Sequence, residues 1–175
     1  MAAKNSVDQR RTTPWTMWTD AKYYRIAAQT LMTRVAAEDT ELIQKQLILP
    51  TLAMLAMSIE STMKSYLYAA WVDPNELKFG YGHDLVLLRR AVDRHSEGEI
   101  QILSRELEPL IDLLRDPYVA KQLQYRAIGQ MTIPIPELLC NKIIEFMAAL
   151  KPFVQEQDRL HCEKHKVQVE PYDDT

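Results

Sequence analysis

Apolar residues recur every three or four positions from about Thr16, the spacing of one face of an amphipathic helix. They are Met17, Trp18, Ala21, Tyr24, Ala28, Leu31, Met32 and Val35. Residues 1–15 are mostly polar and lack this period, so we expect a flexible N-terminal arm there. The pattern therefore predicts a first helix from about residue 16 to a charged joint at residues 38–41.

A second helix is predicted between Pro50 and about Val72. Proline suits the first turn of a helix, where its missing N–H leaves no hydrogen bond unmade. The apolar residues that follow cover most of the helix circumference: Leu52, Leu55, Ala56, Ile59, Met63, Tyr66, Leu67 and Ala70. A helix that is apolar on nearly every side is normally buried, so we expect this helix to be the central one.

Turn-forming residues separate the second helix from a third. Residues 73–75 read Asp-Pro-Asn, and Gly80 and Gly82 follow. His83 or Asp84 is placed to cap the next helix, because short polar side chains accept hydrogen bonds from the first free N–H groups. The buried face of this third helix is predicted to consist of Leu85, Leu88, Ala91 and Val92.

A fourth helical segment is predicted after Gly98, with Ile100, Leu103, Leu107, Leu110 and Leu114 facing inward. Pro109 should kink or divide this segment, since proline removes a hydrogen bond from a helix interior. The Asp-Pro pair at 116–117 is expected to end it. Residues 118–126 are then expected to form a short helical extension.

The last long helix is predicted from about Glu137 to Val154. Pro134 and Pro136 exclude regular helix before it, and Pro152 is a predicted kink. The fold predicted for residues 16–158 is therefore one all-α domain, a compact up-and-down-like bundle of about four to five main helices. Residues 159–175 are highly charged and are expected to form a disordered tail.

Composition agrees with a helical domain. The chain has 175 residues, of which 47% are hydrophobic and four are glycine, few for a protein rich in tight turns. The net charge of -3 excludes a globally basic nucleic-acid binder, so any contact with RNA must be local. Cys140 and Cys162 are too few for a disulfide framework.

The same sequence contains no recognisable secretory leader, and Glu60 and Lys64 interrupt its longest apolar run. We therefore expect a cytoplasmic protein with reduced thiols and no membrane association.

The arrangement of several short motifs resembles the HEPN family, especially its bacterial stand-alone members. The motifs are an apolar helix with Glu60 and Lys64, a loop entering Gly-His-Asp-Leu at 82–85, and the pair Tyr125 and Arg126. The resemblance implies a bundle of about four or five helices that is commonly dimeric. It also implies a link with RNA, because many members are metal-independent ribonucleases of toxin–antitoxin and phage-defence systems and others are inactive RNA-binding or scaffold proteins.

Active members of that family carry an arginine followed within a few residues by a histidine. The imidazole can transfer the proton of the RNA 2′-hydroxyl, and the arginine stabilises charge on phosphorus. Here Arg126 is followed by Ala-Ile-Gly-Gln-Met-Thr-Ile, without a histidine. The required spacing occurs instead at Arg89 or Arg90 with His95 and at Arg159 with His165, where chance accounts for such matches. This departure argues against ribonuclease activity.

A polar centre is predicted around Glu60. Lys64 follows it by four residues, the favourable order for an ion pair on one helix face. A buried carboxylate requires donors, so we expect Glu60 to accept from Arg126 or His83. The candidate catalytic residues are Arg126, His83 and Glu60, and the candidate binding residues are Lys64, Asp84 and Tyr125.

His161, Cys162 and His165 form one cluster with metal-like spacing in the charged tail. Two or three ligands in such a segment are a weak zinc signal. We therefore expect no metal and no other cofactor.

The sequence thus predicts a dimeric bundle that binds RNA or a protein partner and lacks the usual ribonuclease motif. Two alternatives remain open at this point: an active metal-independent ribonuclease and a purely structural or assembly protein. The expected partners are a second copy of the chain, RNA, and an antitoxin or other protein.

Overall fold

The protein is an all-α bundle. The computed structural model describes residues 12–121, 123 and 132–165, and within these ranges every regular element is helical. The elements are α2 (Pro14–Ala36), α3 (Glu41–Ala69), η1 (Glu76–Gly80), α4 (Leu85–His95), α5 (Gly98–Glu106), α6 (Glu108–Val119) and α7 (Pro136–His165). The predicted fold class is confirmed, with three long helices and shorter helices packed against them.

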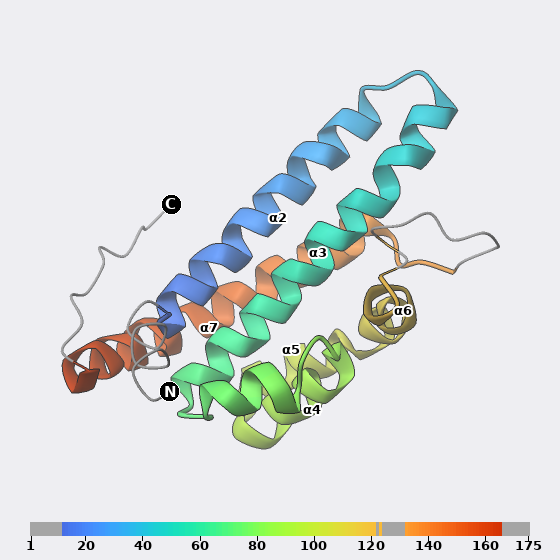
Figure 1. Ribbon diagram of the computed structural model, residues 1–175. Coiled ribbons are helices and arrows are strands. Elements are labelled where there is room, and N and C mark those ends of the chain that lie inside the picture. Colours follow the sequence, from blue (N-terminus) through green and yellow to red (C-terminus); the bar gives the residue numbers. More distant parts are fainter. Residues whose placement is uncertain (1–11, 122, 124–131, 166–175) are drawn as a thin grey trace, which may run out of the picture.

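The long helices α2 and α3 lie side by side and antiparallel, and α7 packs against both of them (Figure 1). Helix α3 also contacts η1, α4 and α6. Fifteen residues of α3, all between Thr51 and Ala69, are buried, among them Ile59 and Met63. The prediction that this helix is central is therefore confirmed, because its apolar residues meet neighbours on nearly every side.

Helices α4, α5 and α6 pack at one end of the long helices and define the surroundings of the polar centre. Asp84 caps α4 by accepting hydrogen bonds from the backbone N–H groups of Val86 and Leu87, as predicted. Gly98 has φ +60° and begins α5, which ends before Pro109 in the first turn of α6. The predicted division near Pro109 is therefore confirmed.

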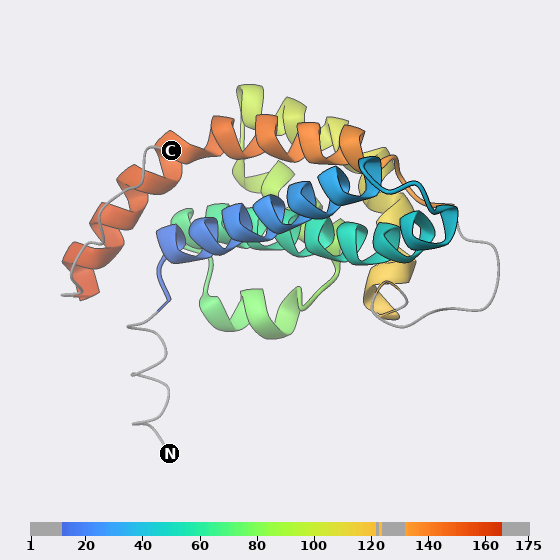
Figure 2. The same ribbon diagram turned by 90° about the horizontal axis from the view of Figure 1, so that it is seen from above.

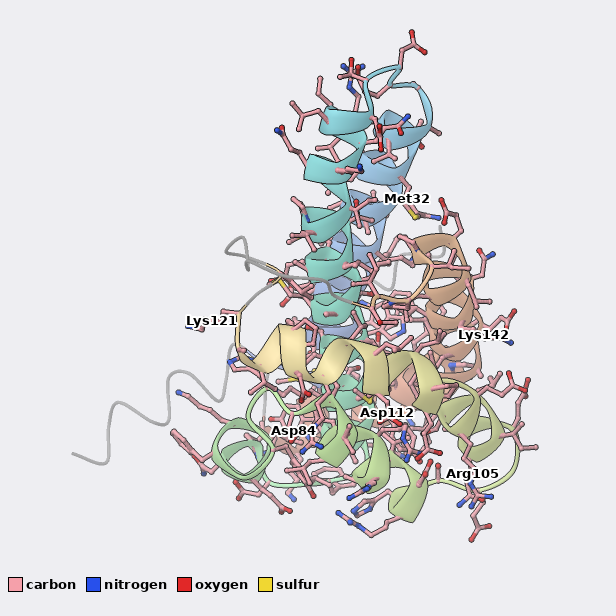
Figure 3. All side chains as sticks on the ribbon, turned by 90° about the vertical axis from the view of Figure 1, so that its right-hand side faces the viewer. Met32, Asp84, Arg105, Asp112, Lys121 and Lys142 are labelled. Carbon is pink, nitrogen blue, oxygen red and sulfur yellow. The ribbon has the colours of Figure 1, made fainter. Side chains whose placement is uncertain are left out.

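The opposite end of the α2–α3 pair projects from the body of the bundle. Figure 3 shows this hairpin extending beyond the other helices, with Met32 near the level at which it leaves them. No residue between 31 and 50 is buried, whereas most residues between 51 and 69 are. Helix α3 therefore contributes its buried core residues from its second half.

One helix begins close to its predicted start, and a second predicted start is wrong. Helix α2 begins at Pro14, with Thr13 and Thr16 forming a capping box, and Trp15 is buried. Helix α3 begins at Glu41 and runs through Pro50. Packing against α2 and the core, to which Ile48 contributes, compensates for the hydrogen bond that proline removes.

Two predicted helix ends also differ from the structure. Helix α6 passes Pro117, which is buried, and ends at Val119. Helix α7 begins at Pro136 and continues to His165, so the expectation of a disordered tail is wrong for residues 159–165. The helix persists there because His161 and Cys162 are buried against the bundle despite their charged neighbours.

Among the described residues, α3 is the one helix long and apolar enough to cross a membrane by length and composition. The expectation that no segment would qualify depended on Glu60 and Lys64, which interrupt the longest apolar run, but α3 also extends back to Glu41. Because most of residues 51–69 form the bundle core, and core helices pass the same criterion, this property is weak evidence for a membrane span.

Candidate functional site

The predicted polar centre exists and is organised around the carboxylate of Glu60. Its side chain is 9% exposed and receives three hydrogen-bonding groups. Lys64 Nζ lies 2.6 Å from Oε1, Tyr118 donates its hydroxyl to Oε2 at 2.6 Å, and His83 Nδ1 lies 3.0 Å from Oε2. We call Glu60, Lys64, His83 and Tyr118 the Glu60 centre.

Three parts of the chain position this centre. Glu60 and Lys64 are one turn apart on α3, and Tyr118 is in the last turn of α6. His83 lies in the loop between η1 and α4, directly before the cap of α4 at Asp84. The centre therefore forms only when α3, α6 and this loop are packed together.

The donors keep the buried carboxylate ionised. Burial alone would raise the pKa of Glu60, but the hydrogen bonds from Lys64, Tyr118 and His83 and the charge of Lys64 lower it below its usual value. Burial and the hydrogen bond to Glu60 raise the pKa of Tyr118 far above its ordinary range. Tyr118 is therefore a permanent hydrogen-bond donor at neutral pH, and Glu60 is a permanent acceptor.

His83 connects the buried carboxylate to the surface. Its side chain is 73% exposed, while Nδ1 is within 3.1 Å of both carboxylate oxygens of Glu60. A carboxylate only accepts hydrogen bonds, so we assign the hydrogen of neutral His83 to Nδ1. Nε2 then carries the lone pair and can accept a proton or a hydrogen bond from a ligand.

A cavity of about 540 Å³ adjoins the Glu60 centre. Its wall combines cationic, polar and apolar side chains. The lining residues are Thr12, Met17, Lys64, Tyr68, Pro74, Asn75, Leu77, Lys78, Gly82 and His83. Next to it, Phe79 is 74% exposed and its ring centroid lies 5.2 Å from Lys78 Nζ. The site thus offers positive charge and an exposed aromatic ring on η1 beside an oriented imidazole.

The structure assigns different roles to the predicted binding residues. Lys64 belongs to the Glu60 centre, whereas Asp84 caps α4 and pairs with Arg115 at 3.3 Å. Figure 3 shows Asp84 beside α6 at the base of the bundle. Tyr125 and Arg126 lie outside the described residues, so the expected contact of Arg126 with Glu60 stays a prediction.

Sequence reasoning missed Tyr118 and η1. Tyr118 was assigned to an extension beyond the helix that contains Leu114, although it follows Leu114 by four residues and therefore shares its helix face. Because the helix was expected to end at Pro117, Tyr118 was not placed on the same helix face as Leu114. The segment with Lys78 and Phe79 was interpreted as a loop, because Asp-Pro-Asn precedes it and Gly80 and Gly82 follow, whereas the structure contains a helical turn there.

A second buried polar group lies far along the chain, at His161 in α7. Its side chain is buried and both ring nitrogens lack a hydrogen-bond partner. The ring stacks on Trp71 with centroids 3.7 Å apart. Within the described part of the chain, no three histidine, cysteine, aspartate or glutamate side chains could jointly hold a metal ion.

The fold and the Glu60 centre together define an all-helical bundle with a carboxylate-anchored histidine at the edge of a cavity. Comparisons with protein-family models, with curated proteins and with solved structures each found no match. The function of the protein is therefore inferred from the geometry of the site alone.

Proposed function

We propose that the protein binds single-stranded RNA at the surface formed by the Glu60 centre, its adjoining cavity and η1. One observation carries this proposal: Glu60 fixes His83 at the edge of a cavity whose lining also includes Lys64 and Lys78. In this proposal the protein is a cytoplasmic, HEPN-like bundle without the usual arginine–histidine motif.

Charge and aromatic exposure support the choice of ligand. Phosphate groups bind local clusters of cations even on an acidic protein. Unpaired bases stack on exposed aromatic rings, and Phe79 provides such a ring next to Lys78. A duplex would hide its bases from Phe79, which is why the proposal specifies single strands.

The proposal is tested by fluorescence anisotropy with a labelled single-stranded RNA of mixed sequence. Lys78→Ala should weaken binding and reduce the dependence of log K on log salt by about one phosphate contact. Phe79→Ala should weaken binding without changing that slope, because it removes stacking and no charge. Lys45→Ala is the matched control. Lys45 is an exposed lysine that pairs with Glu41, and it lies on the distal hairpin, the projecting part of α2 and α3 at residues 31–50.

Equal effects of Lys78→Ala and Lys45→Ala would contradict binding at this surface. No affinity for RNA at low salt would contradict the proposal altogether. That second result would favour the alternative of a structural or assembly protein, with a second copy of the chain or another protein, such as an antitoxin, as its partner.

A second candidate function, metal-independent RNA cleavage, is favoured specifically by the contact between Glu60 and His83. Nε2 of His83 could take the proton of a 2′-hydroxyl, whose oxygen then attacks phosphorus to give a 2′,3′-cyclic phosphate. The departing 5′ oxygen would receive a proton from the imidazolium. This reaction also needs a cation at phosphorus, for which Arg126 is the sequence candidate.

Cleavage of a mixed RNA pool in the presence of EDTA separates the two functions. The binding proposal predicts no cleavage by the wild-type protein. Cleavage that is lost in both His83→Gln and Arg126→Ala would establish the ribonuclease instead. Cleavage that survives both substitutions would identify a contaminating nuclease.

A further inference from the structure

The C-terminal turns of α7 are attached to the end of α3 through Trp71. Helix α7 contains Pro152 and changes direction along its length (Figure 2). Beyond the bend, Gln157 accepts a hydrogen bond from Trp71 Nε1 at 3.1 Å, and His161 stacks on the Trp71 ring at 3.7 Å. Lys164 Nζ lies 4.3 Å from the same ring. We call Trp71, Gln157, His161 and Lys164 the Trp71 latch.

Trp71 ends α3 in a left-handed backbone conformation. Its φ of +65° lies in the left-handed region, which bulky residues rarely adopt. The side chain is 44% exposed, so burial in the core does not hold it. Backbone hydrogen bonds from Trp71 N–H to Tyr68 O and from Val72 N–H to Leu67 O close the end of α3 in this conformation. The stack on His161 and the hydrogen bond to Gln157 fix the position of the Trp71 side chain on α7.

His161 can take part in the latch only as a neutral ring. It is 4% exposed, and neither ring nitrogen makes a hydrogen bond of good geometry, although the backbone of Tyr68 lies close to the ring. Protonation would add a second N–H donor and a full charge to this enclosure. The least costly response is for the ring to leave the stack and reach water.

The charged neighbours of His161 do not reverse its preference for the neutral form. On α7 they are Asp158, Cys162, Lys164 and His165, and α3 contributes Tyr68. Burial is the largest cause that lowers the pKa of His161, and the charges of His165 and Lys164 act in the same direction.

The opposing influences on that pKa are smaller than burial. The backbone of Tyr68 and the carboxylate of Asp158 favour the charged ring. However, Asp158 is itself engaged by the backbone N–H of Trp15 at 2.9 Å. The closed latch is therefore the state of neutral and alkaline pH.

Tyr68 links the latch to the proposed ligand site. Its ring centroid lies 4.8 Å from that of His161, and Tyr68 also lines the cavity beside the Glu60 centre. We propose that protonation of His161 opens the Trp71 latch, frees the last turns of α7 and, through Tyr68, alters the cavity. The effect on ligand binding rests on the proposed function, whereas the opening of the latch does not.

Amide hydrogen exchange tests the opening directly. Protection of residues 155–165, corrected for the intrinsic rate, is compared at about pH 7.5 and about pH 5.5. We expect protection in the wild-type protein to fall severalfold more than in His161→Phe, which keeps an aromatic ring but cannot be protonated. Equal changes in the two proteins would overturn the latch. His161→Gln serves if His161→Phe does not fold, with the same expectation.

RNA affinity tests the link to the cavity. The pH also acts on groups that both proteins share, so the measured quantity is the ratio of Kd between wild type and His161→Phe. This ratio should rise about threefold or more at the lower pH if the latch shapes the cavity. An unchanged ratio would overturn the coupling. If neither protein binds RNA at either pH, the proposed function fails, and hydrogen exchange alone decides on the latch.

Discussion

Glu60 on α3 and His161 on α7 are both buried ionisable side chains, but their polar atoms have opposite surroundings. Glu60 is charged and accepts from Lys64, His83 and Tyr118. His161 is neutral, and its nitrogens have no hydrogen-bond partner. A buried group whose hydrogen bonds are all made holds the helices around it in one arrangement. A buried group without such partners is stable only in its neutral form. The Glu60 centre is therefore expected to be rigid, whereas the surroundings of His161 are expected to respond to pH.

The largest expected effect comes from removing the acceptor at the rigid site. Glu60→Ala leaves the ammonium of Lys64 and the hydroxyl of Tyr118 without their partner, so the free energy of unfolding should fall by about 3 kcal/mol. Urea unfolding measures this loss. Glu41→Ala is the control, because Glu41 also precedes a lysine by four residues on α3 but is exposed. Similar losses in the two variants would show that the Glu60 centre is not stabilising.

A smaller effect is expected from removing one donor. Tyr118→Phe should lower the free energy of unfolding by about 2 kcal/mol, because the hydrogen bond has a charged acceptor. With fewer donors, the pKa of Glu60 should also rise toward its ordinary value, which carbon NMR of the carboxyl group can follow. Tyr23→Phe, at a 62% exposed tyrosine, should change neither quantity. An unshifted Glu60 titration in Tyr118→Phe would contradict the assigned geometry.

The smallest expected effect is the pH dependence of stability at His161. Its pKa is lowered by folding, so the unfolded chain binds protons more readily and stability falls as the pH drops below about 6.5. His161→Phe should lose this dependence. Glu60, whose pKa is also lowered, contributes in a separate and more acidic window, below about pH 4.3. If the free energy of unfolding changed equally with pH in the wild-type protein and in His161→Phe between about pH 7.5 and 5.5, His161 would not be the responsive group.

Local signals in the sequence predicted much of this fold. Asp84 as a helix cap and the division near Pro109 depend on neighbouring residues only, and both are confirmed. The start at Pro50 and the tail after residue 158 were wrong for one reason. Proline and charge disfavour helix locally at these positions, but packing against α2 and burial of His161 outweigh them.

The candidate site was predictable where its residues lie close together in the sequence. Glu60 and Lys64 are neighbours on one helix, and His83 lies next to a recognisable cap. Tyr118 required knowledge that α6 continues past Pro117, and the stack of His161 on Trp71 joins residues far apart in the chain. Contacts of that range depend on tertiary packing, which periodicity along the sequence does not encode.

Photocrosslinking tests the central claim, that RNA binds beside the Glu60 centre, most directly. A single-stranded RNA containing 4-thiouridine would be irradiated with the wild-type protein, and the crosslinked peptides mapped by mass spectrometry. We predict crosslinks within residues 76–83, where Phe79 and His83 lie, and their loss in Phe79→Ala. Crosslinks confined to the distal hairpin at residues 31–50, or none at all, would contradict the account.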